Sequence, residues 1–207
     1  DIINKFRKDI SFKKPYICIC TVGDIEYDKA AVQVSDLINP LDESIGELDI
    51  HGLDKMDNIL KKLCIQGGGG DQAESYECGV LTVPAIFDFD DTVKVTLVIL
   101  GDDVPKYPNI SLLENKLFGK HMSRVTDYFG HDLSPLNIFT RARQRFPIYY
   151  ICKIAKTASD ITRKTKELWC SYVGNENITI IQDPQEFVDK ILDCIQLKVG
   201  LKNNYDL

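Results

Sequence analysis

Residues 67–80 read Gly-Gly-Gly-Gly-Asp-Gln-Ala-Glu-Ser-Tyr-Glu-Cys-Gly-Val, and the predicted fold depends on this stretch. Four consecutive glycines disfavour a helix or strand interior, because glycine loses the most backbone freedom on ordering. They suit a loop whose backbone approaches a ligand closely. Asp71 follows the glycines and precedes an apolar pattern of helical period, so it is a candidate N-cap. The sequence therefore predicts a helix from Asp71 to Val83, ended or kinked by Pro84, whose first turn holds a carboxylate beside free N–H groups.

A second motif follows this predicted helix. Val93–Leu100 is almost continuously valine, leucine and isoleucine, which predicts a central parallel strand buried on both faces. The strand ends in Gly101-Asp102-Asp103, and ligands of parallel sheets bind at the carboxyl ends of the strands. Since hard divalent cations prefer oxygen ligands, Asp71 and Asp102 are candidate ligands of one cation. A helix cap at Asp71 and a simple turn at Asp102 would explain the same residues without a metal.

The rest of the chain alternates between strand and helix patterns. The spacing predicts strands over Tyr16–Val22, Ala31–Leu37, Ile148–Ile154 and Asn177–Ile181, and helices over residues 1–9, Asp54–Ile65, from Ser134, over Ser159–Val173 and from Asp183. The first two strands are expected to pair back across a turn at Asp24–Asp28, and residues 103–133 are expected to be irregular. The alternation predicts an α/β fold, a Rossmann-like, doubly wound, mainly parallel sheet with helices on both faces. No domain boundary is visible, so a single domain over residues 1–207 is expected.

Composition narrows the possible partners and the compartment. The 207 residues are 44% hydrophobic and 27% charged, with a net charge of −6, which argues against nucleic acid or an anionic membrane as the main partner. The densest basic run, Arg141-Ala-Arg143-Gln-Arg145, is interpreted as a solvated helix face. No apolar run is long enough to span a membrane. The seven cysteines lack the spacing of a zinc site, so buried thiols in a reducing compartment are expected, which indicates a cytoplasmic location.

The order of the motifs resembles a known family. Gly-Gly-Gly-Asp-x-x-Glu at residues 68–74 is followed by a helix and then by Val-x-Leu-Val-Ile-Leu-x-Asp-x-x-Pro at residues 95–105. This arrangement is similar to a von Willebrand factor A (VWA) domain, closest to the intracellular subgroup associated with alpha-kinases. The resemblance covers most of the chain, and Asp24 falls on an aspartate of that subgroup's strand-end motif.

The resemblance implies a protein–protein interaction module rather than an enzyme. Such domains carry a metal-ion-dependent adhesion site, in which Mg²⁺ or Mn²⁺ accepts an acidic residue of a partner protein. Carried over, Asp102 matches the third metal loop, Asp71 lies at the second, and Asp24 stands near the rim. The Asp-x-Ser-x-Ser of the first loop is not in the sequence, and Gln72 stands where the subgroup has threonine. The expectation is therefore a VWA-like domain without its first strand, with an incomplete or degenerate metal site. Any catalysis would belong to another domain of the full-length protein.

A second family resemblance gives an alternative function. Ile86–Val93 contains Asp-x-Asp-x-Thr-Val, which resembles the motif of haloacid dehalogenase-like phosphatases. There Asp88 would be the nucleophile and Asp90 the acid/base, with Mg²⁺ between them and the phosphate. That fold needs further units between this motif and its last acidic pair, whereas only about ten residues separate Asp90 from Asp102. The VWA interpretation is therefore preferred.

Overall fold

The computed structural model describes residues 16–37, 58, 61–62, 73–87, 95–153, 159–183 and 186–199. Its longest sheet contains three parallel strands, β4 (Leu97–Gly101), β6 (Ile148–Lys153) and β7 (Ile178–Ile181), in the order β4-β6-β7. Leu97 lies opposite Ile148, and Tyr150 lies opposite Ile178. The predicted α/β class and the parallel pairing of these strands are confirmed.

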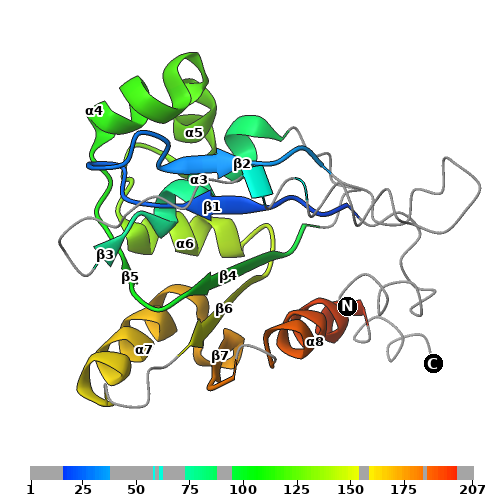
Figure 1. Cartoon of the computed structure of the whole chain (residues 1–207). Helices are drawn as coiled ribbons and strands as arrows, with labels where there is room; N and C mark the ends of the chain where they lie inside the picture. Colours follow the sequence, from blue (N-terminus) through cyan, green and yellow to red (C-terminus); the bar gives the residue numbers. More distant parts are fainter. Residues whose placement is uncertain are drawn as a thin grey trace, which may run out of the picture.

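Two hydrophobic clusters lie on the two faces of β6, because successive side chains of a strand point to opposite sides. Ile148 and Tyr150 belong to the large cluster, which includes Trp169 of α7 (Ser159–Val173). Tyr149 belongs to a smaller cluster with Cys194 of α8 (Glu186–Val199). Helix α7 and helix α8 therefore cover opposite faces of the sheet (Figure 1).

Two shorter pairings complete the strands of the described chain. β1 (Cys20–Val22) and β2 (Val32–Val34) pair antiparallel across the turn that includes Asp24 and Asp28, as predicted, although each strand has three residues only. β3 (Ala73–Glu74) and β5 (Val104–Pro105) pair in parallel. The prediction of a helix starting at Asp71 is therefore wrong at its first turn, because this long-range pairing overrides the local helical pattern.

Helix α3 (Tyr76–Ile86) packs against β1 of the antiparallel pair and against β4 of the parallel sheet. At Gly79, an added Cβ would lie 3.0 Å from Val22 Cγ2, and at Gly101 it would clash with the ring of Tyr76. The absence of a side chain at these two glycines lets β1 and β4 approach the helix closely. Pro84 lies inside the last turn, and the helix continues past the predicted end at Val83.

Residues 103–133 are largely helical rather than irregular. They form α4 (Ile110–Leu112), the π-helical turn η1 (Leu113–Phe118), the 3-10 turn η2 (Gly119–His121) and α5 (Met122–Phe129). The helical signal in the sequence is interrupted by Gly119 and Gly130, which have φ values of 46° and 77°. Leu113, Val125 and Phe129 are fully buried, so tertiary packing fixes these short turns.

Helices α6 (Pro135–Arg143), α7 and α8 agree with their predicted positions, whereas the helices predicted over residues 1–9 and Asp54–Ile65 lie outside the described residues or almost so. Ser134 Oγ accepts a hydrogen bond from the amide of Asn137 at 3.4 Å and caps α6, while the 3-10 turn η3 (Asn175–Asn177) precedes β7. β4 differs from expectation. Within the described residues it is the outer strand of its sheet, and Leu100 is 48% exposed. No described helix has the length and apolar character needed to cross a membrane.

Candidate functional site

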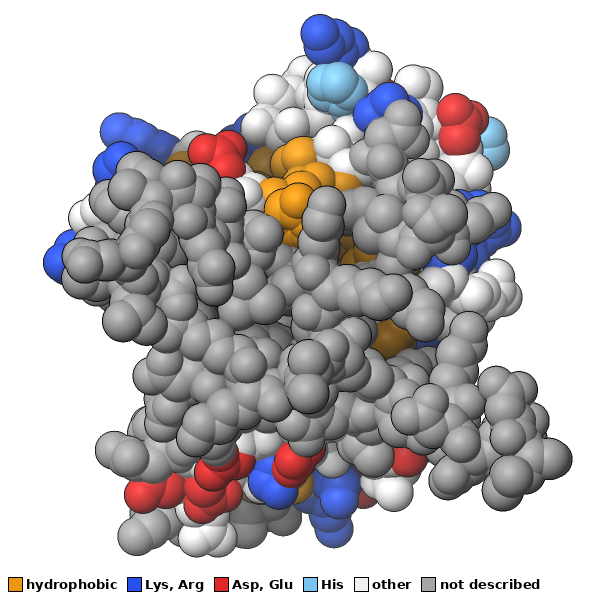
Figure 2. All heavy atoms as spheres, turned by 90° about the vertical axis from the view of Figure 1, so that its right-hand side faces the viewer, with side chains coloured by type: hydrophobic (Ala, Val, Ile, Leu, Met, Phe, Trp, Pro, Cys, Tyr) orange, Lys and Arg blue, Asp and Glu red, His pale blue; other side chains and the backbone are white. Residues whose placement is uncertain are grey.

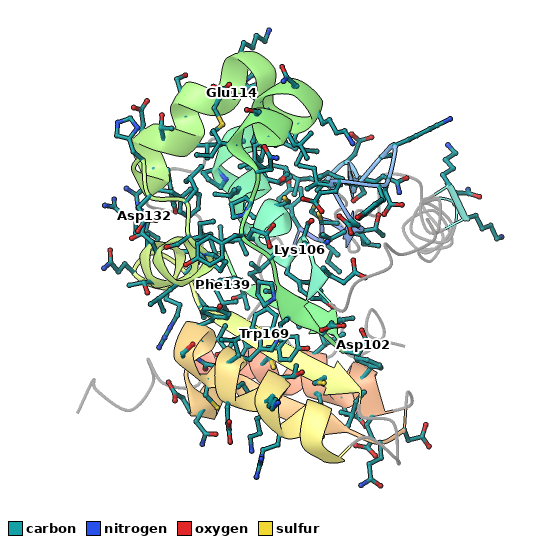
Figure 3. All side chains as sticks on the ribbon, turned by 90° about the vertical axis from the view of Figure 1, so that its left-hand side faces the viewer. Asp102, Lys106, Glu114, Asp132, Phe139 and Trp169 are labelled. Atoms are coloured by element: carbon teal, nitrogen blue, oxygen red, sulfur yellow. The ribbon has the colours of Figure 1, made fainter. Side chains whose placement is uncertain are left out.

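The turn after β4 carries Asp102, whose side chain is exposed. Its neighbour Asp103 is tied to the core through its backbone carbonyl, which accepts hydrogen bonds from Trp169 Nε1 at 2.7 Å and from Tyr150 Oη at 3.1 Å. Trp169 in turn stacks on Tyr150, with ring centroids 3.9 Å apart. Figure 3 looks onto this edge of the molecule, with Asp102 and Trp169 labelled.

A third aromatic side chain holds the same turn. The Tyr76 ring packs against Gly101, and burial, together with the nearby charge of Asp102, raises the pKa of its hydroxyl. Two core aromatics therefore donate to the carbonyl of the turn, and a third packs against the glycine that precedes it. The consequence is a carboxylate, that of Asp102, presented on an immobilised backbone.

Asp24 lies at the same edge, in a buried ion pair. Its Oδ2 accepts a hydrogen bond from Lys106 Nζ at 2.5 Å, and its Oδ1 accepts one from the amide of Glu26 at 3.0 Å. Its own amide donates to Asp28 Oδ2 at 2.7 Å. Lys106 Nζ also lies 3.9 Å from Glu26 Oε2. Both carboxylate oxygens of Asp24 are thus engaged by donors of the chain itself.

The backbone of Lys106 is held as firmly as its side chain. Its amide donates to Glu74 O and to Glu77 Oε2, both at 3.2 Å. Glu77 is fully buried in α3, and burial raises the pKa of its carboxyl group to about 8. Cys78 Sγ donates to the other oxygen of Glu77 at 3.5 Å. The prediction missed Glu77, although a glutamate beside the apolar positions Tyr76 and Val80 was a possible signal.

Several carboxylates gather at this edge and give it a negative electrostatic potential. The pKa of Glu74 is raised by burial and by the charges of Asp24, Asp103 and Asp28, while Lys106 opposes the rise. The described residues nevertheless contain no group of three or more side chains arranged to hold a metal ion. Asp102 could supply one oxygen ligand, and a cation here would need others from outside that part of the chain.

Three predicted residues cannot be placed at this edge. The structure brings Asp24 and Asp102 to the same edge, whereas Asp71 lies outside the described residues, as does the rest of the glycine loop. Asp88 and Asp90, the residues of the phosphatase alternative, also lie outside them. The roles of Asp71, Asp88 and Asp90 therefore stay predictions.

Exposed apolar side chains lie near the ion pair. Tyr27 is 66% exposed, and Tyr107, the residue after Lys106, is 79% exposed. The Lys106 ammonium lies 5.8 Å from the centre of the Tyr27 ring, which places the loop after β1 beside the segment after β5. Tyrosines of this kind are enriched where proteins bind one another.

Comparison with known proteins found no matching family model, no similar curated protein and no similar solved structure.

Proposed function

We propose that this chain is a VWA-type domain that binds a partner protein at the carboxyl ends of its strands. The observation that carries the proposal is the immobilised turn that presents the exposed carboxylate of Asp102. A fixed polar group loses little freedom when it meets a ligand, so more of the interaction energy appears as affinity. The neighbouring Tyr27 and Tyr107 would supply the apolar part of the interface.

We propose that the described strands belong to a doubly wound sheet whose first strand is not among them. β1 and β4 belong to separate sheets, yet the ion pair between Asp24 and Lys106 joins the segment after β1 to the segment after β5, the strand that follows β4. In the usual order of a doubly wound sheet, the first strand lies between the second and the fourth. If β1 is the second strand and β4 the fourth, the exposed Leu100 borders the place of the first strand.

We further propose that the bound cation is Mg²⁺ or Mn²⁺, with Asp102 as a ligand and Asp71 as a second ligand. In this scheme an acidic residue of the partner protein completes the coordination. Asp24 acts differently, since its oxygens already accept hydrogen bonds from Lys106 and Glu26. Its proposed role is structural, because these hydrogen bonds fix the segments that carry the binding edge.

The proposal extends to the compartment of the protein and to catalysis. The described cysteines are unpaired, which is the state that a reducing compartment favours, and we propose a cytoplasmic protein on that ground. Any catalytic activity is proposed to reside in another domain of the full-length protein.

Thermal unfolding in Mg²⁺, in Mn²⁺ and in EDTA tests the metal-dependent form of the proposal. A bound cation stabilises the folded state by about 2.7 kcal/mol when its concentration is about 100 times Kd. We expect the melting temperature to rise with metal and the rise to disappear in Asp102→Ala. Asp127→Ala removes an exposed carboxylate of α5 and should keep the rise. A wild-type melting temperature that neither Mg²⁺ nor Mn²⁺ changes would contradict the proposal.

A further inference from the structure

Two exposed arginines at the C-terminal end of α6 reach the end of α5, Arg145 at Tyr128 and Arg141 at Gly130. Arg141 lies in the last turn of α6, and Arg145 follows one helical turn later, just beyond the helix. Both guanidinium groups lie against residues at the end of α5, which brings them to one part of the surface. Arg143, between them, is directed elsewhere and donates to the carbonyl of Tyr172 at 3.2 Å. Arg141 and Arg145 are called the arginine pair below.

Each member of the arginine pair is held by a neutral group. The Arg145 guanidinium carbon lies 4.0 Å from the centre of the Tyr128 ring, a cation–π contact. Arg141 Nε donates to Asn137 Oδ1 at 3.4 Å. Asn137 is itself fixed, because its Nδ2 donates to the carbonyls of Phe129 and Asp132. Both guanidinium groups are therefore positioned in advance.

Gly130 lets Arg141 approach the turn. Its φ of 77° is in the region that glycine adopts most easily, and an added Cβ would lie 3.3 Å from Arg141 Nη2. The guanidinium group thus lies close to the turn backbone, at the end of α5. On the face shown in Figure 2, lysine, arginine and histidine side chains lie along the upper and right-hand rim, interspersed with acidic side chains.

Within the part of the chain that the structure describes, the arginine pair has no acidic partner. Among the described residues, neither Arg141 nor Arg145 forms an ion pair with a carboxylate, although the chain carries a net charge of −6. The nearby Asp132 uses its Oδ1 to accept a hydrogen bond from the amide of Ser134 at 3.0 Å. An arginine carries five N–H donors in a planar fork, so most donors of the pair are available to a ligand.

We propose that the arginine pair binds an acidic segment of another protein through aspartate or glutamate side chains. Guanidinium and carboxylate form two parallel hydrogen bonds, and positioned arginines lose little freedom on binding. A short acidic peptide would meet the local positive charge, whereas a long polyanion would also meet the net negative charge of the molecule. The surface is distinct from the candidate site, since Asp132 at this turn and Asp102 lie far apart in Figure 3.

Fluorescence anisotropy with a labelled glutamate-rich peptide and the whole chain tests the proposal. The wild-type protein should bind the glutamate peptide and not a glutamine-rich peptide of equal length. The double variant Arg141→Gln/Arg145→Gln should lose at least about tenfold in affinity, since a hydrogen bond to a charged group contributes about 1.5–3 kcal/mol. Circular dichroism would check that the variant is folded.

Two controls decide whether the effect is specific. Arg163→Gln removes an exposed arginine of α7 that pairs with Glu167, and it should leave the affinity within about threefold. Arg141→Lys/Arg145→Lys keeps both charges but loses the planar fork, so its affinity should also fall. An equal loss in Arg163→Gln, full affinity in the lysine variant, or no binding by the wild type would each overturn the proposal. Tighter binding to anionic lipid vesicles or single-stranded nucleic acid than to the peptide would overturn it as well.

Discussion

At the scale of single residues, the ion pair between Lys106 and Asp24 joins the segments after β1 and β5. The side chains are 10% and 1% exposed, so both charges are almost fully removed from water. Burying two charges is costly, and the pair is retained because each charge offsets the desolvation of the other. Its main effect is therefore to fix how the two segments meet.

Replacing Lys106 should show this dependence directly. Lys106→Met leaves the Asp24 carboxylate buried without its cation, and we expect a loss of about 3–5 kcal/mol in the free energy of unfolding in urea. Lys29→Met, at an exposed position of the same region, should cost little. Adding Asp24→Asn to Lys106→Met should recover part of the loss, because the buried charge is then gone. Additive losses from the two substitutions would contradict a direct coupling.

At the scale of elements, the contact between α3 and β4 decides where the Asp102 turn lies. An added methyl group at Gly101 would overlap the Tyr76 ring, whose neighbours include Trp169 at a centroid distance of 5.6 Å. We expect Gly101→Ala to lower the free energy of unfolding by about 1–3 kcal/mol, as overpacking of a core does. The near-ultraviolet circular dichroism of the aromatic cluster should change as well. An unchanged spectrum with unchanged stability would contradict the close contact.

The predicted elements agree with the structure where local signals are strong. Helix α7 begins at Ser159 and ends at Val173, as its apolar spacing predicts, and α6 follows the Ser134-Pro135 start signal. Predictions failed where distant pairing decides. The pairing of β3 with β5 replaces the predicted first turn of α3.

The candidate site could be predicted only where a local sequence signal marks its residues. Asp102 could be found because it follows an apolar strand directly in the sequence. Lys106 reaches Asp24 across 82 positions, and Trp169 reaches Asp103 across 66. No local pattern encodes contacts of that separation, so the ion pair and the aromatic support emerged only from the folded chain.

At the scale of the whole molecule, buried Glu77 links global stability to pH. Its pKa lies at about 8 in the folded state against 4.5 for an ordinary glutamate, because burial disfavours the charged form. The folded state therefore holds a proton that the unfolded state has released between these two values. The stabilising contribution is complete below pH 4.5 and is lost as the pH rises through about 8.

Glu77→Gln should remove this pH dependence. The amide stays neutral and can still accept the hydrogen bond from the Lys106 amide. We expect the variant to gain stability over the wild type as the pH rises from about 5 to about 8, measured by urea unfolding at each pH. Glu114→Gln, at an exposed position of η1, should follow the wild-type profile. Parallel profiles for wild type and Glu77→Gln would show that Glu77 does not titrate in this range.

The hydrogen bond from Trp169 to the Asp103 carbonyl has an optical consequence. Trp169 is the single tryptophan of the chain, so all indole emission comes from a ring that stacks on Tyr150 and is bonded to the turn carrying Asp102. A ligand that shifts this turn would change the electrostatic surroundings of that one fluorophore. The protein thus contains a built-in reporter, and its emission spectrum can follow events at the candidate site without any added label.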